Sequence, residues 1–396
     1  MINSNLNNKP RVIYVTASGA SARSFLVRHF QVLSDRGYEV YLASSDDSEA
    51  RDAVQQANIQ HLPIPLKTHI SIFSDILAVV RLYNYFRKYR PAIVHGHMSK
   101  AGLVSTLAAT LCRVKFRIYH NHGMACYSAR GITKVLLVAI EKTNCLLATE
   151  VVFCSESTKQ LAIELRICNP KKARVIGGGT ISGVNTSKYS PEHARNSSLQ
   201  LINEFPLLSS KKKYVAFVGR VVAHKGIDTL IDAWRLIPEQ TKSTHSLLIA
   251  GANDKNELFG RLRVLVDEDK SVHYLGRIDN ISGLYGLLDI LVLPSWHEGF
   301  PYSVLEAQSC GVPAVLTNVT GNKDAVVDGI TGQLVDVKNA EILANSIENL
   351  LANKILLDEM RNSARQRIVE NYDEDIVLND LVDFYLGKIP LRQIKN

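Results

Sequence analysis

Short apolar runs alternate with amphipathic stretches along the chain, and this alternation predicts an α/β protein. An apolar run at 11–16 is followed by a small-residue loop and a helical pattern, and a second run occupies 38–43. Further runs lie at 93–95, 116–120 and 150–155, separated by stretches with helical spacing. Strands that alternate with helices in this way are typical of parallel sheets. The N-terminal half therefore predicts a Rossmann-like domain.

The same alternation restarts in the C-terminal half. Strand-like runs lie at 213–218, 246–250, 272–275 and 290–293. After the first of these runs, apolar residues share one helix face, because they lie three or four positions apart. They are Ile227, Leu230, Ile231 and Trp234. We therefore expect a second Rossmann-like domain.

Length and composition agree with two soluble domains. A chain of 396 residues is too long for one ordinary core. No apolar run approaches the roughly 18–20 residues of a spanning helix, and Met1–Lys9 is polar and Asn-rich, unlike a signal peptide. The six cysteines contain no C-x-x-C pair, which argues against a zinc site or a disulfide framework. These features predict a cytoplasmic protein.

Positive charge is concentrated in the first half of the chain. The net charge is +8, but residues 1–187 carry an excess of 12 positive charges and residues 188–396 an excess of 4 negative charges. The N-terminal half is therefore the one that attracts an anionic surface. No nucleic-acid-binding motif is present, so nucleic acid is not the expected partner.

The stretch from Ser295 to Gly311 carries the main candidate chemistry. The apolar run before it is expected to be a buried strand that Pro294 ends, and a helix is expected to start at Pro301. A strand, a short loop and a helix N-terminus together present free backbone N–H groups and the positive end of the helix dipole. This arrangement predicts an anion site that fits a phosphate.

Two carboxylates in this stretch are expected to contact different parts of a ligand. Glu298 lies in the loop, whereas Glu306 lies more than a turn into the helix. A nucleotide sugar presents hexose hydroxyls, a diphosphate and ribose hydroxyls in that order, and a carboxylate accepts two hydroxyl donors at once. The alternative is a plain helix N-terminus with an acidic neighbour and a solvated glutamate.

A second motif favours the nucleotide sugar. The sequence Phe217-Val-Gly-Arg220 precedes Lys225-Gly226, and downstream Glu298-Gly-Phe is followed, after five residues, by Glu306. Together these motifs resemble the Gly-Arg…Lys-Gly phosphate loop and the E-x7-E signature of retaining glycosyltransferase family 4. The resemblance covers the whole chain. It implies the GT-B architecture, in which two Rossmann-like domains face each other across a cleft and the second binds the nucleotide.

Composition and resemblance together give the expected domain boundaries. Residues 189–198 are polar and contain Pro191, so we expect the linker there. The acceptor-side domain is expected at 1–188 and the nucleotide-sugar-binding domain at 198–372. In the GT-B architecture the final segment crosses back, which implies here that 373–396 joins the first domain.

The resemblance also implies roles for the residues that match the family's motifs. Arg220 and Lys225 would neutralise the leaving diphosphate, Glu298 would contact the hexose and Glu306 the ribose. His122, at a strand end, matches a histidine that contacts the donor sugar in this family. The catalytic candidates are therefore His122, Arg220, Lys225 and Glu298. The donor-binding candidates are Gly219, Arg220, Lys225, Glu298, Gly299, Phe300, Pro301 and Glu306.

Weaker candidates lie on the acceptor side. His97 and Lys100 occur in His-Gly-His-Met-Ser-Lys-Ala-Gly-Leu, which resembles a segment of bacterial capsule and O-antigen members of the family. Gly19 and Arg23 occupy an early strand-to-helix loop that either lines an acceptor cleft or only starts a helix. His120 ends a strand, where ligands of open α/β sheets bind, although a structural role is the alternative for each histidine.

The resemblance implies a reaction as well as a fold. A hexose or N-acetylhexosamine would pass with retention from a UDP-sugar to a glycan or lipid-diphosphate acceptor, in the synthesis of a capsule or the O-antigen of lipopolysaccharide. No cofactor or metal is expected, because two Asp-x-Asp matches, at 267–269 and 373–375, lie in helical stretches. The alternatives are a nucleotide-sugar 2-epimerase and a non-catalytic nucleotide-sugar-binding protein.

A basic and aromatic segment at 74–90 indicates where the protein works. One interpretation is a helix that lies on an anionic membrane surface. The alternative is a crossover helix whose apolar side packs on the sheet. We therefore expect a cytoplasmic protein that is peripheral on the inner face of the plasma membrane. The basic and aromatic residues are Arg81, Arg87, Lys88, Arg90, Tyr83, Tyr85, Phe86 and Tyr89.

Overall fold

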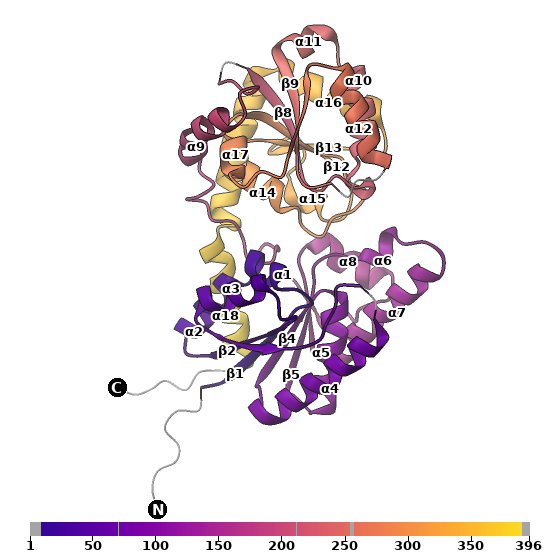
Figure 1. The fold of residues 1–396 in the computed structure, drawn as a ribbon, viewed down its shortest axis with the longest axis vertical. Coiled ribbons are helices and arrows are strands. Elements are labelled where there is room, and N and C mark those ends of the chain that lie inside the picture. Colours follow the sequence, from indigo (N-terminus) through magenta and orange to yellow (C-terminus); the bar gives the residue numbers. More distant parts are fainter. Residues whose placement is uncertain (1–8, 70, 211, 254–256, 390–396) are drawn as a thin grey trace, which may run out of the picture. The chain divides into compact units, whose positions relative to one another are not determined.

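Two compact units make up the chain, each with its own sheet and core (Figure 1). The structure is a computed structural model that describes residues 9–389 apart from 70, 211 and 254–256. Unit 1 comprises Met1–Ser182 and Asp375–Asn396, and unit 2 comprises Gly183–Glu374. The last helix of the chain therefore belongs to the same unit as the first strands.

Unit 1 is built on a seven-stranded parallel sheet in the order β3-β2-β1-β4-β5-β6-β7. The chain moves from β1 to one edge, returns to the middle at β4 and then moves to the other edge, as in a doubly wound sheet. The strands are rich in buried aliphatic residues, as parallel sheets covered on both faces require. They are β1 (Arg11–Val15), β2 (Glu39–Ser44), β3 (Gln60–Pro63), β4 (Ile93–His97), β5 (Phe116–Asn121), β6 (Glu150–Phe153) and β7 (Ala173–Arg174).

The helices of unit 1 pack on this sheet by one apolar side. In α4, for example, Ala78, Leu82 and Phe86 recur every four residues and are buried in the same core cluster as strand residues such as Ile13 and Val94. The helices are α1 (Gly19–Phe25), α2 (Val27–Asp35), α3 (Ser48–Ala57), α4 (Ile72–Tyr89), α5 (Ser99–Leu111), α6 (Ala125–Ser128), α7 (Gly131–Leu147), α8 (Glu156–Glu164) and α18 (Glu374–Lys388).

Unit 2 repeats the design with a six-stranded parallel sheet in the order β10-β9-β8-β11-β12-β13. Its strand order again reverses beside the first strand of the unit. The strands are β8 (Lys213–Val218), β9 (His245–Ala250), β10 (Val272–Gly276), β11 (Leu288–Leu293), β12 (Ala314–Thr317) and β13 (Gly332–Val335).

The helix expected after β8 is α10, and it buries the predicted face. Ile227, Leu230, Ile231 and Trp234 are all fully buried, and Trp234 Nε1 donates to Ser271 Oγ at 3.0 Å. The helices of unit 2 are η1 (Ala223–Lys225, a 3₁₀ turn), α9 (Pro191–Glu204), α10 (Ile227–Leu236), α11 (Glu239–Thr244), α12 (Glu257–Glu268), α13 (Ile281–Tyr285), α14 (Tyr302–Ser309), α15 (Asn322–Ala325), α16 (Ala340–Ala352) and α17 (Lys354–Asn371).

The two Rossmann-like sheets confirm the expected fold class, but the stretch 189–198 is not a linker. It forms the start of α9, because the Ser190 hydroxyl caps the helix by accepting from the His193 N–H at 3.2 Å and Pro191 occupies the first turn. The polar composition of 189–198 resembles a loop because α9 buries only one small face. Strand β3 is short and lies at the sheet edge, so its apolar pattern is too weak to predict it.

The aromatic residues of the 74–90 segment pack on the sheet of unit 1. Phe86 is buried, and Tyr85 and Tyr89 are partly buried against the same core. The C-terminal half of α4 is thus an ordinary crossover helix. Among the described residues, no helix combines the length and the hydrophobicity needed to span a membrane.

The contact between α9 and α13 depends on a glycine. A Cβ on Gly286 would lie 2.3 Å from the carbonyl oxygen of Ala194, whereas one on Gly260 in α12 would meet nothing within 4 Å. Gly286→Ala should therefore lower the free energy of unfolding by about 1–3 kcal/mol through overpacking. Gly260→Ala should raise it by about 0.5–1 kcal/mol, because alanine favours a helix interior. Urea denaturation of both variants checks this, and equal stabilities would contradict it.

Candidate active site

Loops from the middle of the unit 2 sheet meet at the carboxyl ends of their strands. β8, β11 and β12 are neighbours, and the strand order reverses between β8 and β11. Ligands of open α/β sheets bind at such a switch point, because the loops on its two sides diverge. The loop after β8 contains Gly219–Gly226, and the loop after β11 contains Pro294–Pro301. The two sequence motifs are therefore neighbours in space.

The loops after β8 and β11 touch backbone to backbone. Gly226 has a φ of +74°, and a Cβ there would lie 1.9 Å from the carbonyl oxygen of Pro294. The Trp296 N–H donates to the carbonyl oxygen of His224 at 2.8 Å. Only glycine tolerates both this dihedral angle and this approach, so Gly226 sets the distance between the two motifs.

Lys225 and Glu298 form an ion pair between these loops. Lys225 Nζ lies 2.6 Å from Glu298 Oε1, and Ser295 Oγ donates to the same oxygen at 2.6 Å. The pair is largely shielded, because the exposed fraction of the side chain is 19% for Lys225 and 10% for Glu298. The Glu298 N–H also donates to the Thr320 carbonyl oxygen, at 3.2 Å, in the loop after β12. A lysine and a carboxylate thus stand together at the switch point.

Gly219 and Arg220 follow β8 directly. A Cβ on Gly251 would lie 1.9 Å from the Gly219 carbonyl oxygen, so the loop after β9 also packs closely here. The Arg220 side chain is exposed and makes no ion pair with another described residue. An exposed guanidinium at a strand end suits a diphosphate, which it can hold with two parallel hydrogen bonds.

Glu306 lies in the second turn of α14 and is held by an aromatic neighbour. Tyr285 Oη donates to Glu306 Oε2 at 2.8 Å. Burial raises the pKa of Glu306, and the hydroxyls of Tyr285 and Tyr189 partly offset this increase. Sequence spacing did not indicate either tyrosine, because both come from other helices or loops of unit 2.

The other residues of the E-x7-E stretch have structural roles. The Phe300 ring is buried and packs on Tyr372, with centroids 5.5 Å apart. Pro301 is the N-cap of α14, so the helix begins at Tyr302, one residue after the predicted start at Pro301. A Cβ on Gly321 would lie 2.6 Å from the Gly299 carbonyl oxygen, so the loop after β12 is fitted against the motif. Ligand contacts from Phe300 therefore have to come from its backbone.

Two histidines next to the ion pair were missed by the sequence analysis. The rings of His224 and His297 have centroids 5.1 Å apart. Burial lowers the pKa of both, so both are neutral at pH 7 and offer one hydrogen-bond donor and one acceptor. Each directly precedes a motif residue, which is the signal that should have identified them.

In unit 1 the histidine candidates form one cluster at the switch point of the sheet. His95 and His97 of β4 and His120 of β5 are buried, and His122 follows β5. His97 Nδ1 lies 2.9 Å from His122 Nε2. Burial lowers the pKa of His122 to about 3, so His122 is a neutral hydrogen-bonding group at pH 7.

The early loop candidates are held by contacts within unit 1. The Gly19 N–H donates to Asp47 Oδ2 at 3.1 Å, so this glycine joins α1 to the start of α3. Arg23 pairs with Glu49 at 2.7 Å on the exposed surface. These contacts explain both residues without a ligand, and their acceptor roles stay predictions.

Lys100 connects two helices of unit 1. Its Nζ lies 2.8 Å from Asp75 Oδ1 and donates to the His69 carbonyl oxygen. The lysine thereby joins the start of α5 to the start of α4. Its acceptor role likewise stays a prediction.

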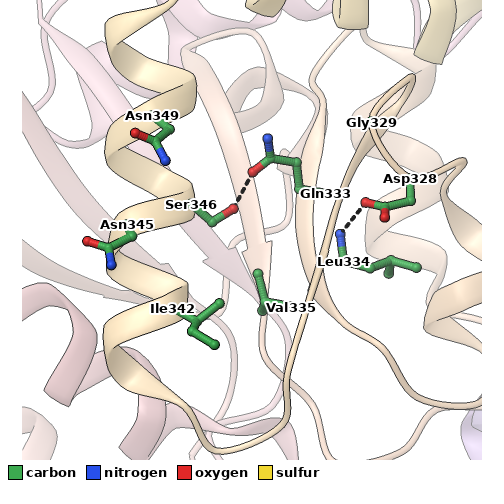
Figure 2. A pocket seen from close by; sticks show the side chains of 9 residues that line it. All are labelled: Asp328, Gly329, Gln333, Leu334, Val335, Ile342, Asn345, Ser346 and Asn349. Carbon is green, nitrogen blue, oxygen red and sulfur yellow. Dashed lines mark hydrogen bonds between the residues drawn. The ribbon is translucent and has the colours of Figure 1, made fainter.

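An open hollow of about 480 Å³ lies elsewhere in unit 2, between β13 and α16 (Figure 2). Its polar groups bond one another: Ser346 Oγ donates to Gln333 Oε1, and the Leu334 N–H donates to Asp328 Oδ1 at 2.8 Å. None of the predicted site residues lines it. The hollow is therefore separate from the candidate active site.

Comparison with protein families covers both units. The model described as Glycosyltransferase Family 4 matches residues 24–180, and the model described as Glycosyl transferases group 1 matches residues 200–367. This chain belongs to glycosyltransferase family 4.

Relatives of this family 4 chain include several bacterial glycosyltransferases. The capsular polysaccharide biosynthesis glycosyltransferase CapM of Staphylococcus aureus is 28% identical over 90% of this chain and 91% of its own length. An Escherichia coli UDP-Gal:alpha-D-GlcNAc-diphosphoundecaprenol alpha-1,3-galactosyltransferase is 24% identical over 92% of each chain. A Campylobacter jejuni N,N'-diacetylbacillosaminyl-diphospho-undecaprenol alpha-1,3-N-acetylgalactosaminyltransferase is 24% identical over 95% of this chain and 98% of its own.

Solved structures establish the fold of the family 4 chain as GT-B. A glycosyltransferase from Rickettsia africae matches with a TM-score of 0.79 and 20% identity, over 97% of this chain and 100% of its own. Anabaena HepE in complex with UDP and glucose matches with a TM-score of 0.79 and 18% identity, over 96% and 100%.

The Tyr285–Glu306 hydrogen bond of this family 4 protein can be tested by its pH dependence. Tyr285→Phe removes a donor that stabilises the charged carboxylate, so the folded-state pKa of Glu306 should rise further. When a carboxyl group has a higher pKa in the folded than in the unfolded protein, the free energy of unfolding falls as pH rises from the unfolded-state pKa to the folded-state pKa. We expect Tyr285→Phe to lower the unfolding free energy by about 1–3 kcal/mol at pH 8 and by less at pH 5.

Tyr274→Phe is the matched control, because Tyr274 Oη donates to the uncharged Gly251 carbonyl at 2.9 Å. Urea denaturation at both pH values should show a deficit of similar size at each for this variant. A Tyr285→Phe deficit that is the same at pH 5 and pH 8 would contradict the assignment.

Proposed function

We propose that this chain transfers a hexose or N-acetylhexosamine, with retention, from a UDP-sugar to a lipid-diphosphate-linked or oligosaccharide acceptor in the synthesis of a bacterial O-antigen or capsule. The observation that carries the proposal is the shielded Lys225–Glu298 pair at the switch point of unit 2. A lysine beside a carboxylate suits the junction of diphosphate and sugar in such a donor. The ammonium attracts the diphosphate, and the hexose hydroxyls donate to the carboxylate.

The cations of the site act where charge develops. In the transfer, the bond between sugar C1 and the diphosphate oxygen breaks, and its electron pair leaves with UDP. C1 bonds to the acceptor oxygen on the same face, and the acceptor hydroxyl gives its proton to the departing diphosphate oxygen. Arg220 and Lys225 stabilise the negative charge that grows on the leaving group. With both cations supplied by side chains, the departure of the diphosphate needs no metal at this position.

Glu306 and His122 take the other contacts of the donor in this proposal. Tyr285 donates to Oε2 of Glu306, and the carboxylate accepts from the ribose with its remaining lone pairs. His122, neutral at pH 7, contacts the donor sugar by a hydrogen bond.

The comparisons support the donor and acceptor classes. HepE was solved with UDP and glucose, and the names of the E. coli and C. jejuni relatives specify diphospho-undecaprenol acceptors. The donor class and the acceptor class are inferred for this chain from its similarity to these proteins. They define the first substrates to test.

Arg220→Ala should reduce turnover by a factor on the order of 10²–10³, because one preorganised charge on the leaving group is lost. The measurement is UDP release from a panel of UDP-sugars with an undecaprenyl-diphosphate-linked sugar as acceptor. The wild type should release UDP faster with acceptor than without it.

The control for this experiment is Arg277→Ala, another exposed arginine of unit 2, which should leave turnover unchanged. Near-normal turnover of Arg220→Ala would remove Arg220 from the mechanism. Interconversion of UDP-sugars without acceptor would indicate an epimerase instead. Binding of UDP without any turnover would indicate a binding protein.

Exposed residues on the surface of unit 1 support the proposal that this enzyme binds an anionic membrane. The N-terminal half of α4, unlike its C-terminal half, leaves apolar side chains exposed: Ile72 is 73% and Phe73 is 80% exposed. On α7, Ile132 is 84% exposed and is flanked by the exposed basic residues Arg130 and Lys134. Both helices pack on α5. Apolar side chains beside basic ones are typical of a surface that inserts into an anionic leaflet.

Membrane binding should therefore depend on these apolar residues and on salt. The wild type should sediment with phosphatidylglycerol vesicles at low salt and be released as salt rises, because salt screens the basic residues. Phe73→Glu combined with Ile132→Glu should abolish sedimentation, whereas Ile355→Glu, at a residue 75% exposed in unit 2, should not. Absence of binding, or equal binding of all variants, would leave a soluble acceptor as the better hypothesis.

A further inference from the structure

Three buried histidines of unit 1 direct their nitrogens into one small space. His95 and His97 alternate along β4 and so share one face of the sheet, and His97 pairs in register with His120 of the neighbouring β5. Their side chains are at most 2% exposed. One nitrogen from each histidine lies within 4.8 Å of the other two. Three imidazoles thus converge from adjacent strands.

Hydrogen bonds determine which nitrogen of His95 carries the proton. His29 Nε2 lies 2.9 Å from the Ile181 carbonyl oxygen, which can only accept, so His29 donates there and its Nδ1 accepts from Tyr14 Oη. Tyr14 can then only accept from Tyr385 Oη, at 3.0 Å. Tyr385 in turn accepts from His95 Nδ1 at 2.6 Å. His95 Nδ1 therefore carries the proton, and His95 Nε2 is unprotonated, with its lone pair available.

The remaining nitrogens of the cluster are unsatisfied. Among the described residues, His95 Nε2, His97 Nε2 and both ring nitrogens of His120 are buried without a hydrogen-bond partner. A buried polar atom without a partner costs about 1–3 kcal/mol. Three of them, one from each histidine, lie within 4.8 Å of one another. They indicate a ligand that accepts several lone pairs at once.

The spacing of the rings suits a metal ion. Ring centroids lie 4.3 Å apart for His95 and His97, 5.3 Å for His95 and His120, and 5.1 Å for His97 and His120. Three imidazoles bound to one tetrahedral zinc through bonds of about 2.0–2.1 Å have centroids about 5 Å apart. Binding of the ion requires these nitrogens, which lie up to 4.8 Å apart, to close to about 3.4 Å.

We propose that His95 Nε2, His97 Nε2 and one nitrogen of His120 bind a divalent transition-metal ion, with zinc as the best-suited candidate. Neutral imidazoles without a carboxylate favour zinc, cobalt, nickel or copper over magnesium or calcium. Three protein ligands leave a fourth position open. Carboxylate pairs and C-x-x-C spacing predict no metal in this sequence, because these histidines meet only through strand register.

The ion has a consequence for the candidate donor residue His122. If His97 Nε2 binds the metal, the proton of His97 must sit on Nδ1 and be donated to His122 Nε2, 2.9 Å away. His122 is then protonated on Nδ1. The ion thereby sets the tautomer that His122 offers to a substrate, without taking part in the departure of the diphosphate.

The test uses the full-length protein with cobalt and zinc as probes. Protein freed of metal by a chelator should bind one equivalent of Co²⁺ and show the visible absorption bands of a tetrahedral site, and Zn²⁺ should displace the cobalt. His120→Leu should lose stoichiometric binding, whereas His245→Gln, at a buried histidine of unit 2, should retain it.

A second variant keeps the proposal testable if His120→Leu fails to fold. Tyr385→Phe keeps all three ligands but removes the acceptor that holds the proton on His95 Nδ1, so metal affinity should fall about 10- to 100-fold. Absence of stoichiometric cobalt binding in folded wild type would overturn the proposal. Unchanged affinity in both variants would overturn it as well.

Discussion

The approach of two backbones at Gly226 is the constraint on which the candidate active site depends. Because the residue before α10 has no Cβ, the loop after β8 lies directly on the Pro294 carbonyl, and Lys225 comes within 2.6 Å of Glu298. A Cβ at this position would push the two loops, and with them the two charged side chains, apart. A backbone dihedral angle thus controls the position of the charged groups, which the sheet of unit 2 then holds rigidly.

The sequence predicted the parts of the structure that depend on local order. The alternation of strands and helices and the buried face of α10 follow from residue spacing alone. The proximity of the two family motifs depends on the strand order of unit 2, which spacing does not reveal. The role of Tyr285 at Glu306 did not follow, because side chains from different elements meet only after packing. The histidine cluster was hidden for the same reason, since the pairing of His97 with His120 is a property of register.

Helix α4 shows a different limit of sequence-based prediction. Its aromatic residues have the period of a helix face, but that period is the same whether the face meets a sheet or a membrane. The structure buries Phe86 and exposes Phe73, about three and a half turns earlier, so one helix has an interior half and a surface half. Only the packing of α4 on the sheet determines which half of the helix is buried and which is exposed.

The last helix of the chain completes the buried network of the first sheet, and this affects the order in which the protein forms on the ribosome. Tyr385 of α18 bonds both Tyr14 of β1 and His95 of β4, so these contacts form only after α18 has been synthesised. Unit 2 ends at Glu374 and contains all its own strands before that point. Domains usually fold from the N-terminus during translation. Here the unit that is synthesised first is the one that is finished last.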